Sequence, residues 1–150
     1  MPFKQTTPMQ TVQNYLHEQI EKRNDILVRI TFYTGESGLR IARLWGNYID
    51  RTGNLRSSTG YVVIRNGEVL NTIINESDKG TDRKTGVKAG EEFLKELAKK
   101  FNKGIALVMA AGMKYSGRVS ARGYDVLDSS VGEVEWVFLR LLKQNGFIAK

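Results

Sequence analysis

The chain has 150 residues, of which 41% are hydrophobic and 26% are charged, and these are ordinary values for one globular domain. It contains no cysteine, which excludes disulfides, thiolate catalysis and iron–sulfur ligation. Twenty-three Lys and Arg against sixteen Asp and Glu give a net charge of +7, a field that attracts polyanions without reading their sequence.

The N-terminal part of the sequence predicts a long helix. Residues 7–10 (Thr-Pro-Met-Gln) have the pattern of a capping box with proline at the first helical position. One helical face then carries Val12, Tyr15, Leu16, Ile20, Arg23 and Leu27. We expect this helix to run to about Phe32 and to stop near Gly35. Residues 26–33 are rich in β-branched and aromatic residues, so a strand there is the alternative.

A second, shorter helix is predicted after residues 35–38 (Gly-Glu-Ser-Gly), which we interpret as a break. Apolar residues three to four positions apart indicate this helix: Leu39, Ala42, Trp45 and Ile49.

Asn66-Gly67 predicts a β-hairpin with a type I′ turn that sets Arg65 opposite Glu68 as an ion pair. In that register one face carries Val62, Ile64, Val69 and Ile73, and the other carries Tyr61, Val63, Leu70 and Ile74. Both faces are apolar. We therefore expect this chain's own helices to cover one face and a neighbouring subunit to cover the other.

The second half of the sequence alternates polar loops with apolar elements. We expect mobile loops at about residues 75–86 and 112–123, an amphipathic helix over residues 87–101, and strands at residues 105–111 and 124–127. The predicted fold is α+β, a single domain over residues 1–150. An antiparallel sheet of about four strands is expected to pack with a long N-terminal helix, a middle helix and a C-terminal helix.

The C-terminal helix is predicted from a second capping box at residues 130–133 to about Gln144, before Asn145-Gly146. Its apolar residues occupy more than one face, which in so small a chain favours a helix shared with a partner. The candidate subunit-interface residues are Trp136, Phe138, Leu139 and Leu142.

Catalytic and metal-binding patterns are weak in this sequence. His17 is the only histidine, and without cysteine the chain lacks ligands for zinc or copper. The acidic pairs Glu91/Glu92 and Asp125/Asp128 are typical of helix surfaces and helix starts. We predict no catalytic, cofactor-binding or metal-binding residues and hence a protein that is not an enzyme.

Residues 112–119 resemble a P-loop, but Arg118-Val119 stands where a phosphate cradle needs Lys and a hydroxyl residue. We interpret this segment as a basic loop that contacts DNA or an acidic neighbour. The candidate DNA, channel or partner contacts are Lys79, Arg83, Lys84, Lys88, Lys114, Arg118 and Arg122. The longest apolar stretch, residues 105–113, is far shorter than the roughly 20 residues of a membrane span, so we expect a soluble protein.

The most informative segment is residues 52–58, Thr-Gly-Asn-Leu-Arg-Ser-Ser. Its first three residues have turn chemistry, because Gly adopts positive φ and Asn bonds back to its own backbone. In this local reading Leu55 fills the core, and Arg56 with the serines begins a strand.

The Thr-Gly-x-Leu-Arg-x-Ser spacing, after a helical stretch and before an Asn-Gly hairpin, resembles the tail-completion or neck family of tailed bacteriophages. The positions that carry the resemblance are Thr52, Gly53, Leu55, Arg56 and Ser58. Ile49 stands where the family usually has proline, and the family's later Tyr-Ala-x-x-Val-Glu strand is only echoed by the apolar run that ends at Gly112.

The resemblance implies a structural virion protein, assembled in the bacterial cytoplasm, that forms a hexameric or dodecameric ring between head connector and tail. This ring is a tail-completion ring, a tail terminator or a connector ring. Its implied partners are further copies of itself, other neck, portal or tail proteins, and genomic DNA that passes through the channel without sequence-specific contact. The alternative is a basic nucleic-acid-binding protein of a phage or mobile element.

Overall fold

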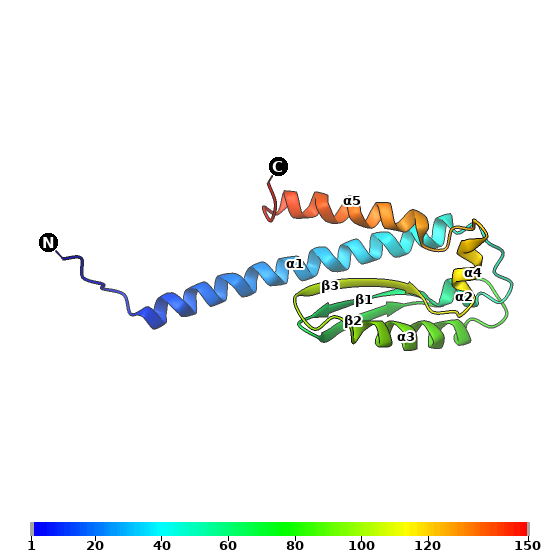
Figure 1. Ribbon diagram of the computed structural model, residues 1–150, viewed down its shortest axis with the longest axis horizontal. Helices are drawn as coiled ribbons and strands as arrows, with labels where there is room; N and C mark the ends of the chain where they lie inside the picture. The colour runs from blue at the N-terminus through cyan, green and yellow to red at the C-terminus, as the bar shows by residue number, and fades with distance from the viewer. Residues whose placement is uncertain (1, 150) are drawn as a thin grey trace.

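The computed structural model describes residues 2–149 and has the expected α+β organisation (Figure 1). In chain order the elements are α1 (Met9–Trp45), α2 (Asn54–Ser57), β1 (Thr59–Arg65), β2 (Glu68–Ile74), α3 (Lys84–Ala98), β3 (Ile105–Ala111), α4 (Ser116–Ala121) and α5 (Asp128–Gln144). The loop predicted at residues 112–123 therefore contains a short helix.

The sheet has three antiparallel strands in the order β2-β1-β3. Figure 1 shows α1 crossing one face of the sheet with α5 packed along it, while α3 covers the opposite face. The central strand β1 is buried from Thr59 to Ile64. Helices of the same chain thus cover both faces of β1, so no neighbouring subunit is needed there, whereas Val69 and Leu70 of β2 remain exposed and the expected cover by a subunit stays a prediction for them.

The predicted fourth strand at residues 124–127 does not form. Val126 is buried against Tyr48, Leu55 and Ala111, and the Asp125 N–H donates to the Asn47 side chain at 2.7 Å. Val126 and Leu127 are packed at the end of the core, so the segment is held there and does not pair with the outer edge of β3.

Helix α1 runs without interruption through the predicted break, so the separate second helix is part of α1 and ends at Trp45. The glycines serve close packing. A Cβ on Gly35 would lie 2.6 Å from the Tyr61 ring, and one on Gly38 would lie 2.4 Å from Val134 Cγ2 of α5. Gly35 and Gly38 let α1 approach the sheet and α5, and this demand outweighs their poor helix propensity.

The run at residues 26–33 is helical, as the main prediction had it. Within and just after this run, two threonines bond back to the preceding turn of the helix through their hydroxyls. Thr31 donates to the Leu27 carbonyl at 2.7 Å, and Thr34 donates to the Ile30 carbonyl at 2.8 Å.

Because α1 lies so close to the sheet, we predict that two Gly→Ala changes alter the free energy of unfolding in opposite directions. Gly35→Ala should lower the free energy of unfolding by about 1–2 kcal/mol, because overpacking against the buried Tyr61 ring exceeds the gain in helix propensity. Gly132→Ala in α5 meets nothing within 4 Å and should raise that free energy by roughly 0.5–1 kcal/mol. Urea unfolding of both variants checks this prediction, and stabilisation by both would contradict it.

The hairpin turn forms as predicted, with φ of 51° at Asn66 and 84° at Gly67 and with Arg65 opposite Glu68. The predicted ion pair between Arg65 and Glu68 is replaced by ion pairs of Arg65 with two residues of α1. The Arg65 guanidinium binds Glu21 at 2.5 Å and Asp25 at 3.3 Å, both on α1. The hairpin is thereby tied to the long helix.

A register shift between Val63 and Ile64 exchanges the predicted positions of two isoleucines. Ile73 packs with Tyr61 and Val63 on the α1 side, while Ile74 lies against Gly90 of α3. A β-bulge inserts one residue into the alternation and so moves the following side chains to the other face.

Neither predicted capping box forms. Helix α1 begins after Pro8 without a side-chain cap. Helix α5 begins two residues early, at Asp128, so Glu133 lies past the first turn and accepts a hydrogen bond from the Ser37 hydroxyl at 3.1 Å. The predicted stop after α5 is confirmed by Gly146 with φ of 70°.

Candidate functional site

Residues 52–58 form a tight turn into α2 at the end of the molecule where α1 finishes. Gly53 has a φ of 77°, as the turn chemistry predicts, and Leu55 is 2% exposed. Leu55 packs with Tyr48, Ala111 and Val126, so its predicted role in the core is confirmed.

Arg56 joins this turn to the end of α1. Its backbone N–H donates to the Asp50 carboxylate at 2.8 Å, and its guanidinium donates to the Gly46 carbonyl at 2.7 Å. The guanidinium also lies 5.1 Å from the centre of the Tyr48 ring. Arg56 therefore binds groups of its own chain. Burial raises the pKa of the Tyr48 hydroxyl, and the positive charge of Arg56 partly opposes this rise.

The remaining polar residues of the segment hold two other loops. The Asn54 side chain accepts from the Gly86 N–H at 2.7 Å, and the Ser57 hydroxyl accepts from the Ser77 N–H at 2.9 Å. The Ser58 hydroxyl donates to the Leu55 carbonyl at 2.8 Å and accepts from the Met113 N–H at 3.3 Å. Residues 52–58 are thus a hub that fixes the loops on either side of the sheet.

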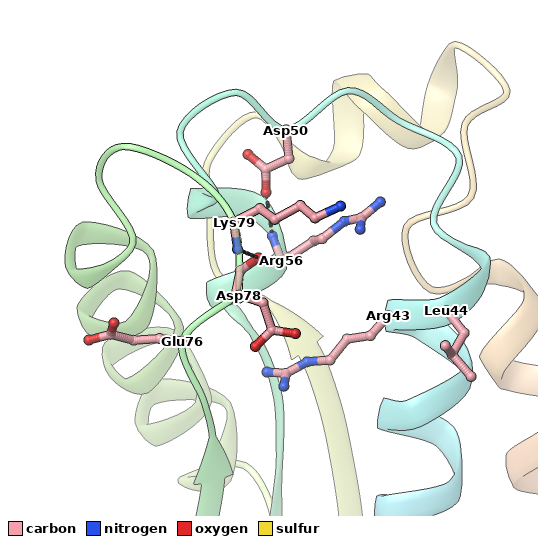
Figure 2. Close-up of a pocket in the computed structure, with 8 residues that line it drawn as sticks. Arg43, Leu44, Asp50, Arg56, Glu76, Asp78 and Lys79 are labelled. Atoms are coloured by element: carbon pink, nitrogen blue, oxygen red, sulfur yellow. Dashed lines mark hydrogen bonds between the residues drawn. The ribbon is translucent and has the colours of Figure 1, made fainter.

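Beside this hub lies a cleft of about 520 Å³. Its charged lining consists of Arg43, Asp50, Arg56, Glu76, Asp78 and Lys79. Figure 2 shows Arg43 reaching from α1 toward Asp78. Arg43 donates to the Asn75 carbonyl at 2.8 Å, and burial lowers the pKa of its guanidinium. With three basic and three acidic side chains, the cleft has no net preference for an anion or a cation.

The predicted basic contacts fall into two groups, and both lie toward the end of the molecule where α1 finishes (Figure 1). Lys79, Lys84 and Lys88 are exposed around the start of α3. Arg83 differs from them, because it donates to the Ser77 carbonyl at 3.0 Å and lies 3.8 Å from Glu76. The second group, Lys114, Arg118 and Arg122, is exposed on and around α4.

The predicted interface residues of α5 point in two directions. Trp136 and Leu139 are 56% and 43% exposed, with Arg140 stacked 4.4 Å from the centre of the indole ring. Phe138 and Leu142 are half-buried and line a hollow between α5, α1 and the hairpin. Of this candidate set, Trp136 and Leu139 form the outward-facing surface.

The acidic pair Asp125/Asp128 makes local hydrogen bonds to serine residues. Asp125 accepts from the Ser129 N–H at 3.1 Å, and Asp128 accepts from the Ser120 hydroxyl at 3.2 Å. His17 is exposed on α1. Within residues 2–149 no group of three acidic or histidine side chains lies close enough to hold a metal ion.

Two exposed apolar surfaces are absent from the sequence-based set of candidates. The N-terminal arm, residues 9–20 of α1, projects beyond the body of the molecule in Figure 1. It exposes Met9, Val12, Tyr15, Leu16 and Ile20. The distal patch, at the other end of α1, consists of Leu44, Trp45 and Ile49. The helical spacing of the arm residues was the available signal, but it is equally typical of a helix that packs on its own core.

Among residues 2–149, no helix combines the length and hydrophobicity that a membrane crossing requires. No protein-family model, no curated protein and no solved structure matches the chain.

Proposed function

We propose that this chain is a structural protein of the neck of a tailed bacteriophage and that its copies form a ring between the head connector and the tail. The proposal is supported by residues 52–58, whose spacing resembles that of the tail-completion or neck family. It is also supported by their setting, since a helix precedes them and an Asn-Gly hairpin follows them.

The observation that carries the proposal is the pair of apolar surfaces at opposite ends of α1. An exposed apolar stripe on a projecting helix is unfavourable in water unless another protein surface covers it. A protein whose role is assembly has such surfaces, whereas an enzyme needs a convergent site of reactive groups. In the charged cleft beside the hub, Arg43 and Arg56 already donate to the backbone carbonyls of Asn75 and Gly46, and the cleft does not supply such a site.

In this role the exposed basic residues face the DNA that passes through the channel or an adjoining ring. Lysine and arginine contact phosphates without reading bases, which suits a channel through which any sequence must pass. The net charge of +7 agrees with such a surface. The proposed location is the virion, with portal and tail proteins as further partners.

The test measures the mass of the purified full-length chain by light scattering, together with negative-stain electron microscopy. We expect closed rings of six or twelve copies and only weak DNA binding in free solution. A monomer at every accessible concentration would contradict the proposal. Genes for portal and tail-tube proteins on either side of the coding gene would support it.

The second candidate is a free-standing nucleic-acid-binding protein. It is favoured by a row of exposed lysines along α3, formed by Lys84, Lys88, Lys95 and Lys99. This candidate requires a monomer or dimer that binds DNA tightly, with affinity falling steeply as salt increases. Glu92 and Glu96 interrupt the lysine row, which weakens a continuous phosphate-binding surface. A DNA titration at two salt concentrations separates this candidate from the ring.

A further inference from the structure

Strand β3 is an outer strand of the sheet, and its far edge faces no other strand. In an antiparallel ladder, residues that bond across alternate with residues whose backbone groups point away. The Gly112 N–H donates to the Ser58 carbonyl at 3.0 Å, and this bond fixes the alternation along β3. The backbone N–H and C=O groups of Ile105, Leu107 and Met109 therefore point away from β1. Within residues 2–149 no hydrogen bond joins them to another group.

The other edge of the sheet, on β2, is blocked in three ways. It carries the charged Glu68, it contains the bulge, and the outward Thr72 N–H is already bonded to the Asn71 side chain at 2.9 Å. Charges, bulges and prolines are the usual means by which proteins keep a free edge from pairing. Strand β3 has none of them: its sequence is Ile-Ala-Leu-Val-Met-Ala-Ala, and its register is unbroken. The edge of β3 is therefore open to another strand.

An apolar hollow lies beside this edge on the α5 side of the sheet. Its volume is about 290 Å³. Leu107 and Met109 of β3 form one wall, and Leu127, Val131 and Val134 form the other. We call this space the α5 hollow. It has the lining that receives large apolar side chains.

A second hollow lies beside β3 on the opposite face, where α3 covers the sheet (Figure 1). Its volume is about 340 Å³. Phe93 and Leu97 of α3 and Ala110 of β3 supply apolar walls, while Ser116 and Ser120 of α4 make the far side polar. This hollow suits smaller side chains that carry a hydroxyl group.

We propose that an extended segment of a different protein adds to the sheet as a fourth strand along the outer edge of β3. The outward backbone groups of Ile105, Leu107 and Met109 bond to the backbone of the segment. Side chains that pair with Leu107 and Met109 enter the α5 hollow, and those between them face α3. A segment of about five residues spans this edge, with large apolar residues at alternate positions.

A second copy of this chain fits the edge poorly. Helix α5 runs beside β3 at both ends, since it lines the α5 hollow at Met109 and another hollow at Ile105. Antiparallel pairing of two β3 strands would place both α5 helices on the same side of the joined sheet and in the same space.

The loops of this chain also lack a suitable segment. Residues 2–8 have one large apolar side chain, Phe3, and residues 75–83 have none. Residues 124–127 alternate apolar and polar residues but are held at the end of the core. The segment therefore comes from another protein. This inference goes beyond the proposed ring and does not depend on it.

Amide hydrogen exchange on the natural chain tests whether the edge is open. We expect the amides of Leu107 and Met109 to exchange at least about 100-fold faster than those of Val108 and Ala110, which bond to β1. Slow exchange at Leu107 that depends on protein concentration would overturn the proposal in favour of pairing between copies. Slow exchange at every concentration would show an edge already covered, which also overturns it.

A fused strand tests the pairing itself. The segment Val-Thr-Val-Thr-Val-Thr is attached to the C-terminus of the full-length chain through a Gly/Ser linker of about 25 residues, which holds it at an effective concentration of about 1 mM. Exchange at Leu107 and Met109 should then slow by at least about 10-fold. The control segment, Val-Pro-Val-Pro-Val-Pro, keeps the valines but cannot form the ladder, so it should leave exchange unchanged. Equal exchange in the two fusions would overturn the proposal.

A variant in the wall of the α5 hollow tests where the valines lie. Val131 is 63% exposed, so Val131→Lys keeps the fold while placing a charge in this hollow. It should abolish the slow exchange of the Val-Thr fusion. The matched control is Gly132→Lys, because a Cβ at Gly132 meets nothing within 4 Å and the residue does not line the hollow. Urea unfolding confirms that both variants are folded. Slow exchange that persists in Val131→Lys would overturn the assignment of the α5 hollow.

These measurements are independent of the test for the ring. Light scattering on the natural chain reports ring formation, whereas the fusions report strand pairing. Rings without slowed exchange in the Val-Thr fusion would overturn the added strand and leave the ring proposal standing. Monomers in which that fusion slows exchange would overturn the ring and support the added strand.

Discussion

Replacing Gly53 by Ala should lower the free energy of unfolding by about 2–5 kcal/mol. Gly53 has a φ of 77°, which costs an L-residue about 1–2 kcal/mol. Its Cβ would also lie 2.2 Å from the Lys79 carbonyl oxygen, a backbone atom that moves only if the adjoining loop moves. Urea unfolding followed by circular dichroism measures the loss.

Gly123→Ala is the matched control for this change. Gly123 has a φ of 84°, but a Cβ there meets nothing within 4 Å. The control isolates the cost of the left-handed backbone, about 1–2 kcal/mol, from the cost of the close approach. Equal losses in the two variants would show that contact with Lys79 contributes nothing.

Leu94→Ala should destabilise the protein by about 2–5 kcal/mol, because it leaves a cavity in the core between α3 and the sheet. Leu94 is fully buried and packs in a cluster with Val62, Ile64, Ala98 and Ala110. Denaturant unfolding measures the change in midpoint at an unchanged slope.

The control for Leu94→Ala is Leu70→Ala on the outer strand β2. Leu70 is 38% exposed, so its truncation should cost less than about 1.5 kcal/mol and create no closed cavity. If Leu94→Ala cost no more than Leu70→Ala, the packing of α3 on the sheet would be contradicted.

These changes act on folding rather than on a surface of the protein. Residues 52–58 hydrogen-bond to backbone atoms of neighbouring loops and to the Asp50 carboxylate, so their substitution acts on stability first. The arm residues Val12 and Leu16 are exposed, so we expect their substitution to leave the stability of the folded body nearly unchanged. The resemblance in residues 52–58 therefore concerns the scaffold, and we expect the identity of the partner to depend on surfaces outside it.

Features that depend on a few adjacent residues were predictable from the sequence. Asn66-Gly67 adopts positive φ at both positions and turns the chain, Gly146 ends α5, and Leu55 is buried after a glycine turn. In each case the backbone preference of one or two residues decides the local structure, and no distant contact opposes it. The α+β class and the antiparallel sheet follow from the same local patterns.

Other features were decided only by tertiary packing. Glycine reads as a break in a sequence, yet Gly35 and Gly38 lie inside α1 because Tyr61 and Val134 need the space that a side chain would take. Val126 fills the core and so forms no fourth strand, and a bulge in the hairpin exchanges the faces of Ile73 and Ile74.

Whether the apolar face of the N-terminal arm is buried or exposed was likewise decided only by the tertiary structure. The spacing of Val12, Leu16 and Ile20 determines that one face of the helix is apolar, but the sequence does not contain the distance between that face and the body of the protein. Only the fold places Arg23 and Glu21 at the edge of the body and leaves residues 9–20 beyond it. Burial depends on which residues far apart in the chain come together, and periodicity within one helix carries no information about them.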